Sequence, residues 1–257
     1  MTAPATAVSR AAARRPQRRV FLRTHLGLGD HLVCNALVRH VARRAAVVLP
    51  VKPHNAASVQ FMLRDVPVEV VQAKDDAEAD ALVAAARGPS DELLNYCFFD
   101  GDRNAQFMCT GITFDKFIYL LAGLPLGARY AGFCVQRDAQ RERALAGRLA
   151  PADGAPYVFV HEDPQRGFRL DPARMRGDLP IVRPTPALTD NIFDYAGLIE
   201  NAAEVHCFDS SFALLADYMD LGPGRRYLHG YVRTYPDVRN GELLNPTYRD
   251  TGWIRVD

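Results

Sequence analysis

The 257-residue sequence lacks several features that would assign a protein to a special class at once. No apolar run approaches the ~20 residues that a helix needs to cross a bilayer, and the N-terminus lacks the continuous apolar stretch of a secretory signal. The five cysteines are scattered without CxxC spacing, which argues against a disulfide framework and a zinc site. We therefore expect a protein of the cytoplasm, a reducing compartment, and assign it no metal and no cofactor.

Signatures of several enzyme classes are also missing. The sequence contains no GxSxG nucleophile elbow, no HExxH zinc motif and no GK[ST] step of a nucleotide-binding P-loop. Candidate catalytic and binding residues must therefore be sought in the loops that the fold brings together.

Charge is balanced over the whole chain but concentrated at one end. The formal net charge is +1, and five arginines crowd the N-terminus: Arg10, Arg14, Arg15, Arg18 and Arg19. Without this tail the chain is mildly acidic, which argues against a dedicated nucleic-acid-binding protein. We expect residues 1–18 to form a disordered basic leader. Alternatively, the leader makes a peripheral contact with anionic lipid at the inner membrane surface.

Beyond the leader, short apolar strands alternate with helices. In the first half the strands are predicted at residues 19–23, 45–49, 66–71 and 93–99, with helices between them at residues 31–44, 55–64 and 75–86. Such alternation is typical of a parallel sheet with crossover helices. The first half is therefore expected to be Rossmann-like.

The same alternation restarts after a linker-like stretch at residues 150–156. Strands are predicted at residues 157–161, 180–182, 204–208 and 226–228, with helices at residues 137–149, 191–202 and 210–219. Between the halves, the pattern indicates a helix at residues 114–124 and an extended segment at residues 130–135. The predicted fold is α/β, with two Rossmann-like halves whose parallel sheets face a central cleft. The predicted division is residues 19–130 and residues 131–257.

Three loops that follow predicted strands carry most of the candidate polar residues, and the first spans residues 24–31. Ligands in open parallel sheets bind beyond the carboxyl ends of strands, and glycines let the backbone approach a ligand closely. Leu32 stands where a dinucleotide-binding GxGxxG motif needs its third glycine, so a nicotinamide cofactor is not favoured. The candidate ligand-contacting residues are His25, Gly27, Gly29, Asp30, His31 and Asn35. Alternatively, Asp30 only caps the following helix.

The second loop spans residues 161–168. Arg166, beside Gly167, is suited to hold a diphosphate with its planar guanidinium fork. His161, Glu162 and Asp163 offer acid–base groups. The alternative is an ordinary polar turn in which Arg166 pairs with Asp163.

The third loop joins a predicted strand to a predicted helix through Asp209, Ser210 and Ser211. The two hydroxyls and the free N–H groups of a helix N-terminus form a natural phosphate cradle. The alternative is that Asp209 serves only as the N-cap of the helix.

Other polar groups are weaker candidates. Asp100 and Asp102 form a D-x-D pair that suits Mg²⁺ or Mn²⁺, or an ordinary turn. Lys116 lies on an apolar helix and points either to the cleft or to solvent. An aromatic-polar cluster after the last predicted strand suits stacking on a base or sugar, or packing against the sheet edge: Tyr227, His229, Tyr231 and Tyr235.

The first and third loops resemble motifs of a known enzyme group. Residues 25–31 are similar to the N-terminal glycine-rich loop of heptosyltransferase-like glycosyltransferases of the GT-B fold, and residues 205–212 resemble their donor-binding segment. The Ser-Ser-Phe step at residues 210–212 also resembles the fucosyltransferase branch of that fold, whose arginine-bearing strand end is similar to residues 160–166. In this chain the arginine is displaced to Arg166.

The resemblance implies a metal-independent glycosyltransferase of polysaccharide biosynthesis, which moves a sugar from a nucleotide-diphosphate donor to a glycan or glycolipid acceptor. It implies an acceptor-binding set of Gly27, Gly29, His31 and Asn35, and a donor-binding set of His161, Arg166, Asp209, Ser210 and Ser211. The predicted catalytic residues are His25, Asp30 and Glu162, because a base must deprotonate the acceptor hydroxyl. Two alternatives stay open. One is a phosphosugar or nucleotide-sugar hydrolase or epimerase on the same scaffold, and the other is a non-catalytic nucleotide-sugar-binding protein.

Overall fold

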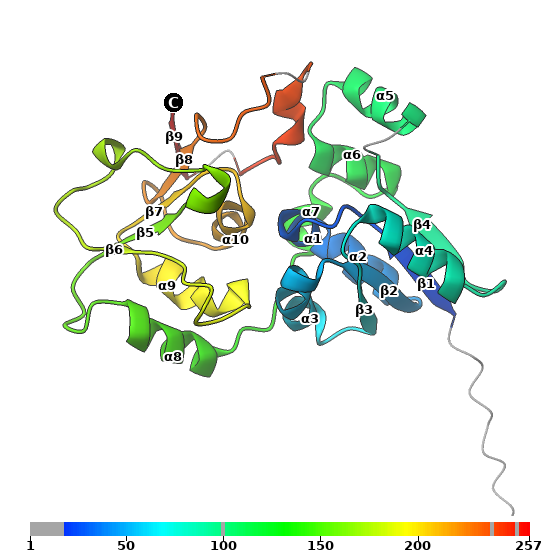
Figure 1. The fold of residues 1–257 in the computed structure, drawn as a ribbon, viewed down its shortest axis with the longest axis horizontal. Helices are drawn as coiled ribbons and strands as arrows, with labels where there is room; N and C mark the ends of the chain where they lie inside the picture. The colour runs from blue at the N-terminus through cyan, green and yellow to red at the C-terminus, as the bar shows by residue number, and fades with distance from the viewer. Residues whose placement is uncertain (1–17, 99–100, 237–238, 250–251) are drawn as a thin grey trace, which may run out of the picture.

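The computed structural model describes residues 18–98, 101–236, 239–249 and 252–257. It is an α/β protein with two parallel sheets in two lobes, which confirms the predicted fold class (Figure 1). The predicted basic leader lies outside the described residues except for Arg18, and so does Asp100. Among the described residues, no helix is both long and apolar enough to span a membrane.

The first sheet has four parallel strands in the order β3-β2-β1-β4. Val20 pairs with Val47 in the register of the two central strands, and both side chains are fully buried. Burial of successive residues on these strands shows that both sheet faces are covered, as in other α/β proteins. The strands are β1 (Arg19–Arg23), β2 (Ala46–Val51), β3 (Val68–Gln72) and β4 (Glu92–Asn95). The helices of this lobe are α1 (Leu28–Val33), α2 (Asn35–Ala42), η1 (Pro53–Asn55), α3 (Ala56–Leu63), α4 (Asp76–Ala86), α5 (Gly101–Thr110), α6 (Phe114–Leu121) and α7 (Ala128–Ala131).

The second sheet has five parallel strands in the order β6-β5-β7-β8-β9. Phe159 pairs with Val205 at its centre, and neither side chain is exposed. The strands are β5 (Val158–His161), β6 (Ile181–Val182), β7 (Glu204–Cys207), β8 (Arg226–His229) and β9 (Trp253–Val256). The helices are α8 (Ala139–Leu149), η2 (Pro164–Arg166), η3 (Pro172–Arg174), η4 (Ile192–Tyr195), α9 (Ala196–Asn201), α10 (Ser211–Tyr218) and η5 (Gly241–Leu244).

The two lobes share one buried apolar cluster, which contains Leu32 of α1 and Leu214 of α10. A polar contact also joins them, since the Ser58 hydroxyl accepts from the Ile192 amide at 2.9 Å and donates to the Asp190 carbonyl at 3.2 Å. The C-terminal segment returns to the first lobe, where the Thr247 hydroxyl lies 2.7 Å from that of Thr113. We propose the predicted division after residue 130, near the end of α7, as the boundary.

Several predicted element bounds change in the structure. The helix predicted at residues 31–44 starts earlier and is interrupted at Cys34, whose φ of −81° and ψ of 0° separate α1 from α2. The helix predicted at residues 114–124 ends at Leu121, because Gly123 adopts a positive φ of 66° and closes the end with a Schellman pair of hydrogen bonds. Part of the extended segment predicted at residues 130–135 belongs to α7.

Candidate functional site

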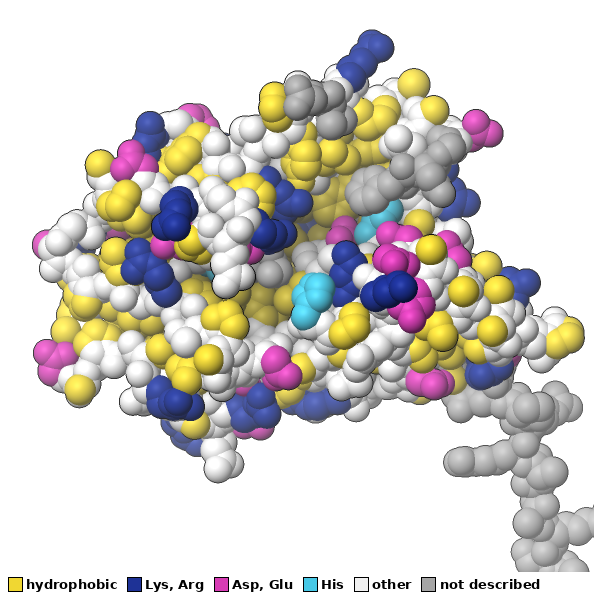
Figure 2. Space-filling model, viewed as in Figure 1, with side chains coloured by type: hydrophobic (Ala, Val, Ile, Leu, Met, Phe, Trp, Pro, Cys, Tyr) yellow, Lys and Arg dark blue, Asp and Glu magenta, His cyan; other side chains and the backbone are white. Residues whose placement is uncertain are grey.

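A cleft of about 800 Å³ separates the carboxyl ends of the strands of the two sheets. Figure 2 shows the hollow between the lobes, with charged and histidine side chains at its rim. All three loops singled out in the sequence contribute to it, together with segments after β2 and β8. Its polar lining residues are Asp30, Lys52, His54, Asn55, His161, Asp163, Arg166, Asp209, Ser210, Ser211, Arg233 and Tyr235.

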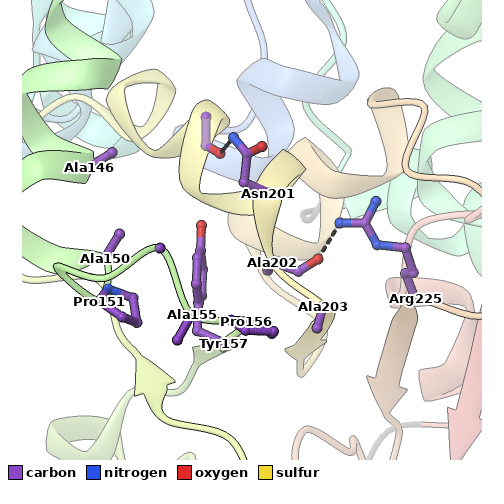
Figure 3. A pocket seen from close by; sticks show the side chains of 12 residues that line it. Ala146, Ala150, Pro151, Ala155, Pro156, Tyr157, Asn201, Ala202, Ala203 and Arg225 are labelled. Carbon is purple, nitrogen blue, oxygen red and sulfur yellow. Dashed lines mark hydrogen bonds between the residues drawn. The ribbon is translucent and has the colours of Figure 1, made fainter.

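A second pocket of about 580 Å³ lies at the opposite, amino ends of β5, β7 and β8 (Figure 3). Its polar groups serve the protein itself: Arg225 donates to the carbonyls of Glu200 and Ala202, and Tyr157 donates to that of Leu198. Ligands in open parallel sheets bind at the carboxyl ends of strands. The first cleft is therefore the candidate functional site.

The glycine-containing loop after β1 is fixed from beneath by two buried residues. Arg23 donates to Asp80 at 2.7 Å and to Asp76 at 3.1 Å, both on α4, and to the Thr24 carbonyl at 3.1 Å. The Asn55 amide donates to the Leu26 carbonyl at 3.0 Å. These contacts hold the loop in one position at the cleft wall.

The two glycines of this loop are needed for space, because neither has a positive φ. A Cβ on Gly27 would stand 2.4 Å from an Asp30 carboxylate oxygen, so the glycine makes room for that side chain to fold back over the loop. A Cβ on Gly29 would stand 3.1 Å from Leu214, so this glycine lets α1 approach α10 of the other lobe. Both line the cleft, and the predicted close approach of a ligand to these glycines stays a prediction.

Asp30 is partly buried on the first-lobe wall of the cleft. Burial raises the pKa of its carboxyl to about 6, although Arg233 and backbone hydrogen bonds at the loop oppose this shift. Such a carboxyl is largely ionised at neutral pH and still binds a proton readily. These are the properties of a general base.

His25, His31 and Asn35 lie outside the lining of the cleft, unlike Asp30 and the two glycines. His25 is buried and packs edge-on against Phe98, with ring centroids 4.6 Å apart. Burial, with a smaller effect of His25, lowers the pKa of His31 to about 3. Asn35 holds the backbone of Cys134 in both directions, at 3.1 and 3.0 Å. For His31 the reason is geometric, since neighbours on a short helix point about 100° apart and only one face of α1 meets the cleft.

On the opposite wall, the second and third loops meet through a hydrogen bond of 3.0 Å between Ser210 Oγ and His161 Nδ1. Ser210 Oγ also accepts from the Ala213 amide at 3.3 Å, so its O–H is free to donate to the imidazole. Burial lowers the pKa of His161 to about 4, which keeps it neutral and able to accept. Ser210, not Asp209, is the N-cap of α10, and the alternative role proposed for Asp209 is wrong.

Arg166 lines the same wall and is also paired with Asp163, as its Nε lies 2.6 Å from a carboxylate oxygen. The predicted pair of Arg166 and Asp163 is therefore confirmed, and diphosphate binding by Arg166 stays a prediction. Gly167 has a φ of 83°, a conformation that favours glycine, and it turns the chain so that Phe168 bridges back to Asp163. Asp163 also caps η2. The turn thus fixes the side of the cleft on which Arg166 lies.

Glu162, predicted as catalytic, does not line the cleft. Its carboxylate accepts from the Leu170 amide at 3.2 Å and from Arg183 at 3.0 Å. Neighbouring residues at a strand end point to opposite faces, so His161 and Glu162 cannot both meet the cleft.

Asp209 lies deeper, with one carboxylate oxygen 2.5 Å from the Tyr248 hydroxyl. Burial raises its pKa, against the opposing effects of Tyr248 and Arg233. Four polar cleft residues carry no prediction from the sequence: Lys52, His54 and Asn55 after β2, and Arg233 after β8. Lys52 directly follows a strand, so the rule that found the other loops could have found it as well.

The aromatic-polar cluster divides, because Tyr235 lines the cleft, whereas His229 and Tyr231 belong to a hydrogen-bonded chain that crosses β7 and β8. The Asp171 amide donates to the Tyr231 hydroxyl at 2.9 Å, which lies 3.0 Å from His229. His229 lies 2.9 Å from His206, which lies 3.1 Å from Glu204. The link between His206 and His229 has one donor and one acceptor only if at least one of the two imidazoles is neutral. Tyr227 stacks on His206 at 4.3 Å.

This chain predicts a loss of stability in acid. Burial lowers the pKa of His206, and it lowers that of His229 to about 4, whereas an unfolded histidine titrates near 6.5. Below about pH 6.5 the unfolded chain therefore binds more protons, so the unfolding free energy falls with falling pH. We expect His229 to contribute about 1–2 kcal/mol of this fall between pH 7 and 5. Urea unfolding at both pH values should show a smaller fall in His229→Gln, but an unchanged one in the exposed control His40→Gln. Equal falls in all three proteins would contradict the prediction.

Two other weak candidates lie on helices of the first lobe. Asp102 lies on α5, and Lys116 lies on α6 outside the cleft lining. Among the described residues, no group of three or more His, Cys, Asp or Glu side chains is arranged to hold a metal ion.

The fold and the cleft define an α/β protein with two parallel sheets and one inter-lobe site. No protein-family model matches the chain, and no curated protein matches it. Among solved structures, it is similar to a glycosyl transferase of family 9 from Veillonella parvula DSM 2008, with a TM-score of 0.53 and 8% identity over 95% of this chain and 88% of that one. It is also similar to the iron-containing dodecameric glycosyltransferase TibC from enterotoxigenic E. coli H10407, with a TM-score of 0.47 and 12% identity over 78% and 55%. The first of these likenesses shows the fold.

Proposed function

We propose that the protein is a glycosyltransferase that moves a sugar from a nucleotide-diphosphate donor to a glycan or glycolipid acceptor. The observation that carries the proposal is that the two walls of the cleft offer complementary chemical groups. Asp30, a carboxyl with a pKa of about 6, faces a loop pair with a guanidinium, a histidine and a helix N-terminus. The fold shared with a glycosyl transferase of family 9 supports the same reaction class.

The donor side is assigned to the second lobe. The diphosphate would lie at the start of α10, where the amides of the first turn and the positive end of the helix favour an anion. Arg166 offers N–H donors beyond the one that it gives to Asp163. Ser210 and His161 are linked by their own hydrogen bond, which gives the wall a fixed shape.

The acceptor side is assigned to the first lobe, with Gly27, Gly29, Lys52 and His54 beside Asp30. In the proposed step, Asp30 takes the proton of the acceptor hydroxyl while that oxygen bonds to the anomeric carbon. The bond between the anomeric carbon and the donor diphosphate breaks at the same time. The negative charge then falls on the leaving group, where Arg166 and the helix amides stabilise it. We propose that the reaction needs no metal, since these groups supply the positive charge.

A thermal-shift screen against nucleoside diphosphates and their sugars tests the function. A ligand at ~100 times its dissociation constant stabilises a protein by roughly 2.7 kcal/mol, which for a chain of this size is a shift of roughly 5–10 °C. We expect such a shift in the native protein and a smaller one in Arg166→Ala. The control Arg176→Ala, whose guanidinium pairs with Asp178 away from the cleft, should respond as the native protein does. No shift with any nucleotide would refute the proposal.

A glycolipid acceptor would also bring the protein to a membrane. We propose a peripheral contact at the inner membrane surface, made by residues 1–17 of the basic leader, which lie outside the described residues. Vesicles with and without anionic lipid, tested against a variant that lacks residues 1–17, would decide this point.

A further inference from the structure

Arg233 stands in the cleft wall, four residues beyond the end of β8, with 35% of its side chain exposed. Its Nη1 donates to the Asp209 carbonyl at 3.2 Å and lies 3.9 Å from the nearer Asp209 carboxylate oxygen. The guanidinium also lies 5.5 Å from the ring centroid of Tyr235. This is a long ion pair for a residue that carries five N–H donors.

Arg166, the other arginine of the cleft lining, makes a shorter ion pair than Arg233 does. Arg166 holds a carboxylate oxygen of Asp163 at 2.6 Å, whereas one carboxylate oxygen of Asp209 is already taken by the Tyr248 hydroxyl at 2.5 Å. Asp209 thus positions Arg233 mainly through its backbone carbonyl. Of the two arginines in the described lining, Arg233 is the one whose charge is less fully matched by a carboxylate contact.

The position of Arg233 follows from the fold of the third loop. The carbonyl that it contacts belongs to Asp209, directly before the N-cap residue Ser210. An anion bound at the first turn of α10 would therefore lie within reach of the Arg233 fork. Asp30, on the other wall of the same cleft, is close enough for Arg233 to oppose the rise of its pKa.

We propose that Arg233 is a catalytic residue that binds the departing diphosphate together with Arg166. The inference rests on the proposed function, since it assigns a residue to the donor diphosphate. On donor binding, the guanidinium gives its free N–H donors to phosphate oxygens. Two forked, charge-assisted contacts then hold one leaving group, a geometry suited to a diphosphate.

Isothermal titration with inorganic pyrophosphate and with nucleoside diphosphates tests whether Arg233 binds the diphosphate. Loss of a charge-assisted contact should weaken both ligands ten- to hundred-fold in Arg233→Ala and less in Arg233→Lys, which keeps the charge without the fork. Arg176→Ala serves as the control. Urea unfolding of each variant checks that the fold is intact, which we expect because Arg233 is partly exposed.

The pH profile adds a readout that a merely structural role of Arg233 would not move. Removing the positive charge of Arg233 should shift the acid limb of kcat/KM to higher pH in Arg233→Ala, whereas Arg166→Ala should leave the limb near its native position. The decisive case is one in which the native protein binds nucleotide and Arg166→Ala binds it more weakly. Unchanged affinities and an unchanged acid limb in Arg233→Ala would then overturn this inference alone. No nucleotide binding by the native protein would overturn the proposed function as well.

Discussion

Asp30→Asn is expected to lose about 10²–10⁴-fold in the rate of sugar transfer, the range that a positioned general base contributes. The amide has nearly the same size and can still accept a hydrogen bond from the loop, but it cannot take a proton from the acceptor. The rate is measured as release of nucleoside diphosphate from the nucleotide sugar that gives the largest thermal shift. The thermal shift itself should persist, because the proposed diphosphate site lies on the other wall.

The pH dependence provides an independent check on the same residue. Because the pKa of Asp30 is raised to about 6, kcat/KM of the native protein should fall tenfold for each unit below about pH 6. Asp30→Asn should lack this acid limb. A native profile that is flat between pH 5 and 8 would mean that Asp30 is not the base.

Stability separates a lost base from a lost fold. The raised pKa means that, between about pH 4 and 6, the folded protein binds a proton at Asp30 more tightly than the unfolded chain does. Ionisation of Asp30 therefore costs stability as pH rises through this range. Asp30→Asn removes that cost, so its unfolding free energy at pH 7.5 should equal or exceed that of the native protein.

Glu162→Gln is the matched control, since the sequence offers Glu162 as a base as well. Its carboxylate bonds to Leu170 and Arg183 outside the cleft lining, so we expect a change in rate of less than about threefold, because a group out of reach of the acceptor contributes no proton transfer. A larger loss in Glu162→Gln than in Asp30→Asn would exchange the roles of the two residues.

The sequence predicts the layout of this site better than its individual contacts. Alternation of strands and helices fixes a parallel sheet, and the carboxyl ends of parallel strands lie on one edge. That rule brings Asp30, Arg166 and Ser210 to one cleft, although Asp30 precedes the other two by more than a hundred residues of chain. Local patterns sufficed there because each residue lies in the loop or the first helical turn that follows a strand.

Side-chain direction is the part that local patterns could not give. Asp30 and His31 are neighbours, yet the first lines the cleft and the second is buried, because the packing of α1 against α10 decides which helix face meets the cleft. Arg233 lies in a loop without a helix or strand pattern. Its place depends on Asp209, a residue 24 positions away in the chain, so only the folded structure reveals it.

Arg129→Met is expected to lower the unfolding free energy by about 3–5 kcal/mol, the usual cost of leaving one member of a buried ion pair alone. The Arg129 and Asp115 side chains are 2% and 3% exposed and lie 2.5 Å apart. Arg129 also donates to the Thr247 carbonyl at 2.6 Å and to the Tyr218 hydroxyl at 2.8 Å. One guanidinium thus joins α6, α7, α10 and the C-terminal segment.

A double-mutant cycle isolates the pair. Asp115→Asn combined with Arg129→Met removes both charges, so the double variant should be more stable than the sum of the two single losses predicts. Arg39→Met is the matched control, because Arg39 and Asp65 are less buried, at 12% and 18% exposure, and should contribute about 1 kcal/mol or less. Urea unfolding of the four variants gives the comparison.

Arg129→Met also links the stability of the fold to the cleft. Leu244 and Pro246 line the cleft, and the neighbouring Thr247 is held by Asp115 through its amide at 3.1 Å and by Arg129 through its carbonyl. Loss of the guanidinium should loosen this wall before the rest of the fold, because Arg129 holds the Thr247 carbonyl directly. Hydrogen exchange should then show faster opening at residues 241–249 than in β1 or β7. A uniform increase across both sheets would show that Arg129 stabilises the core alone and leaves the cleft wall independent of it.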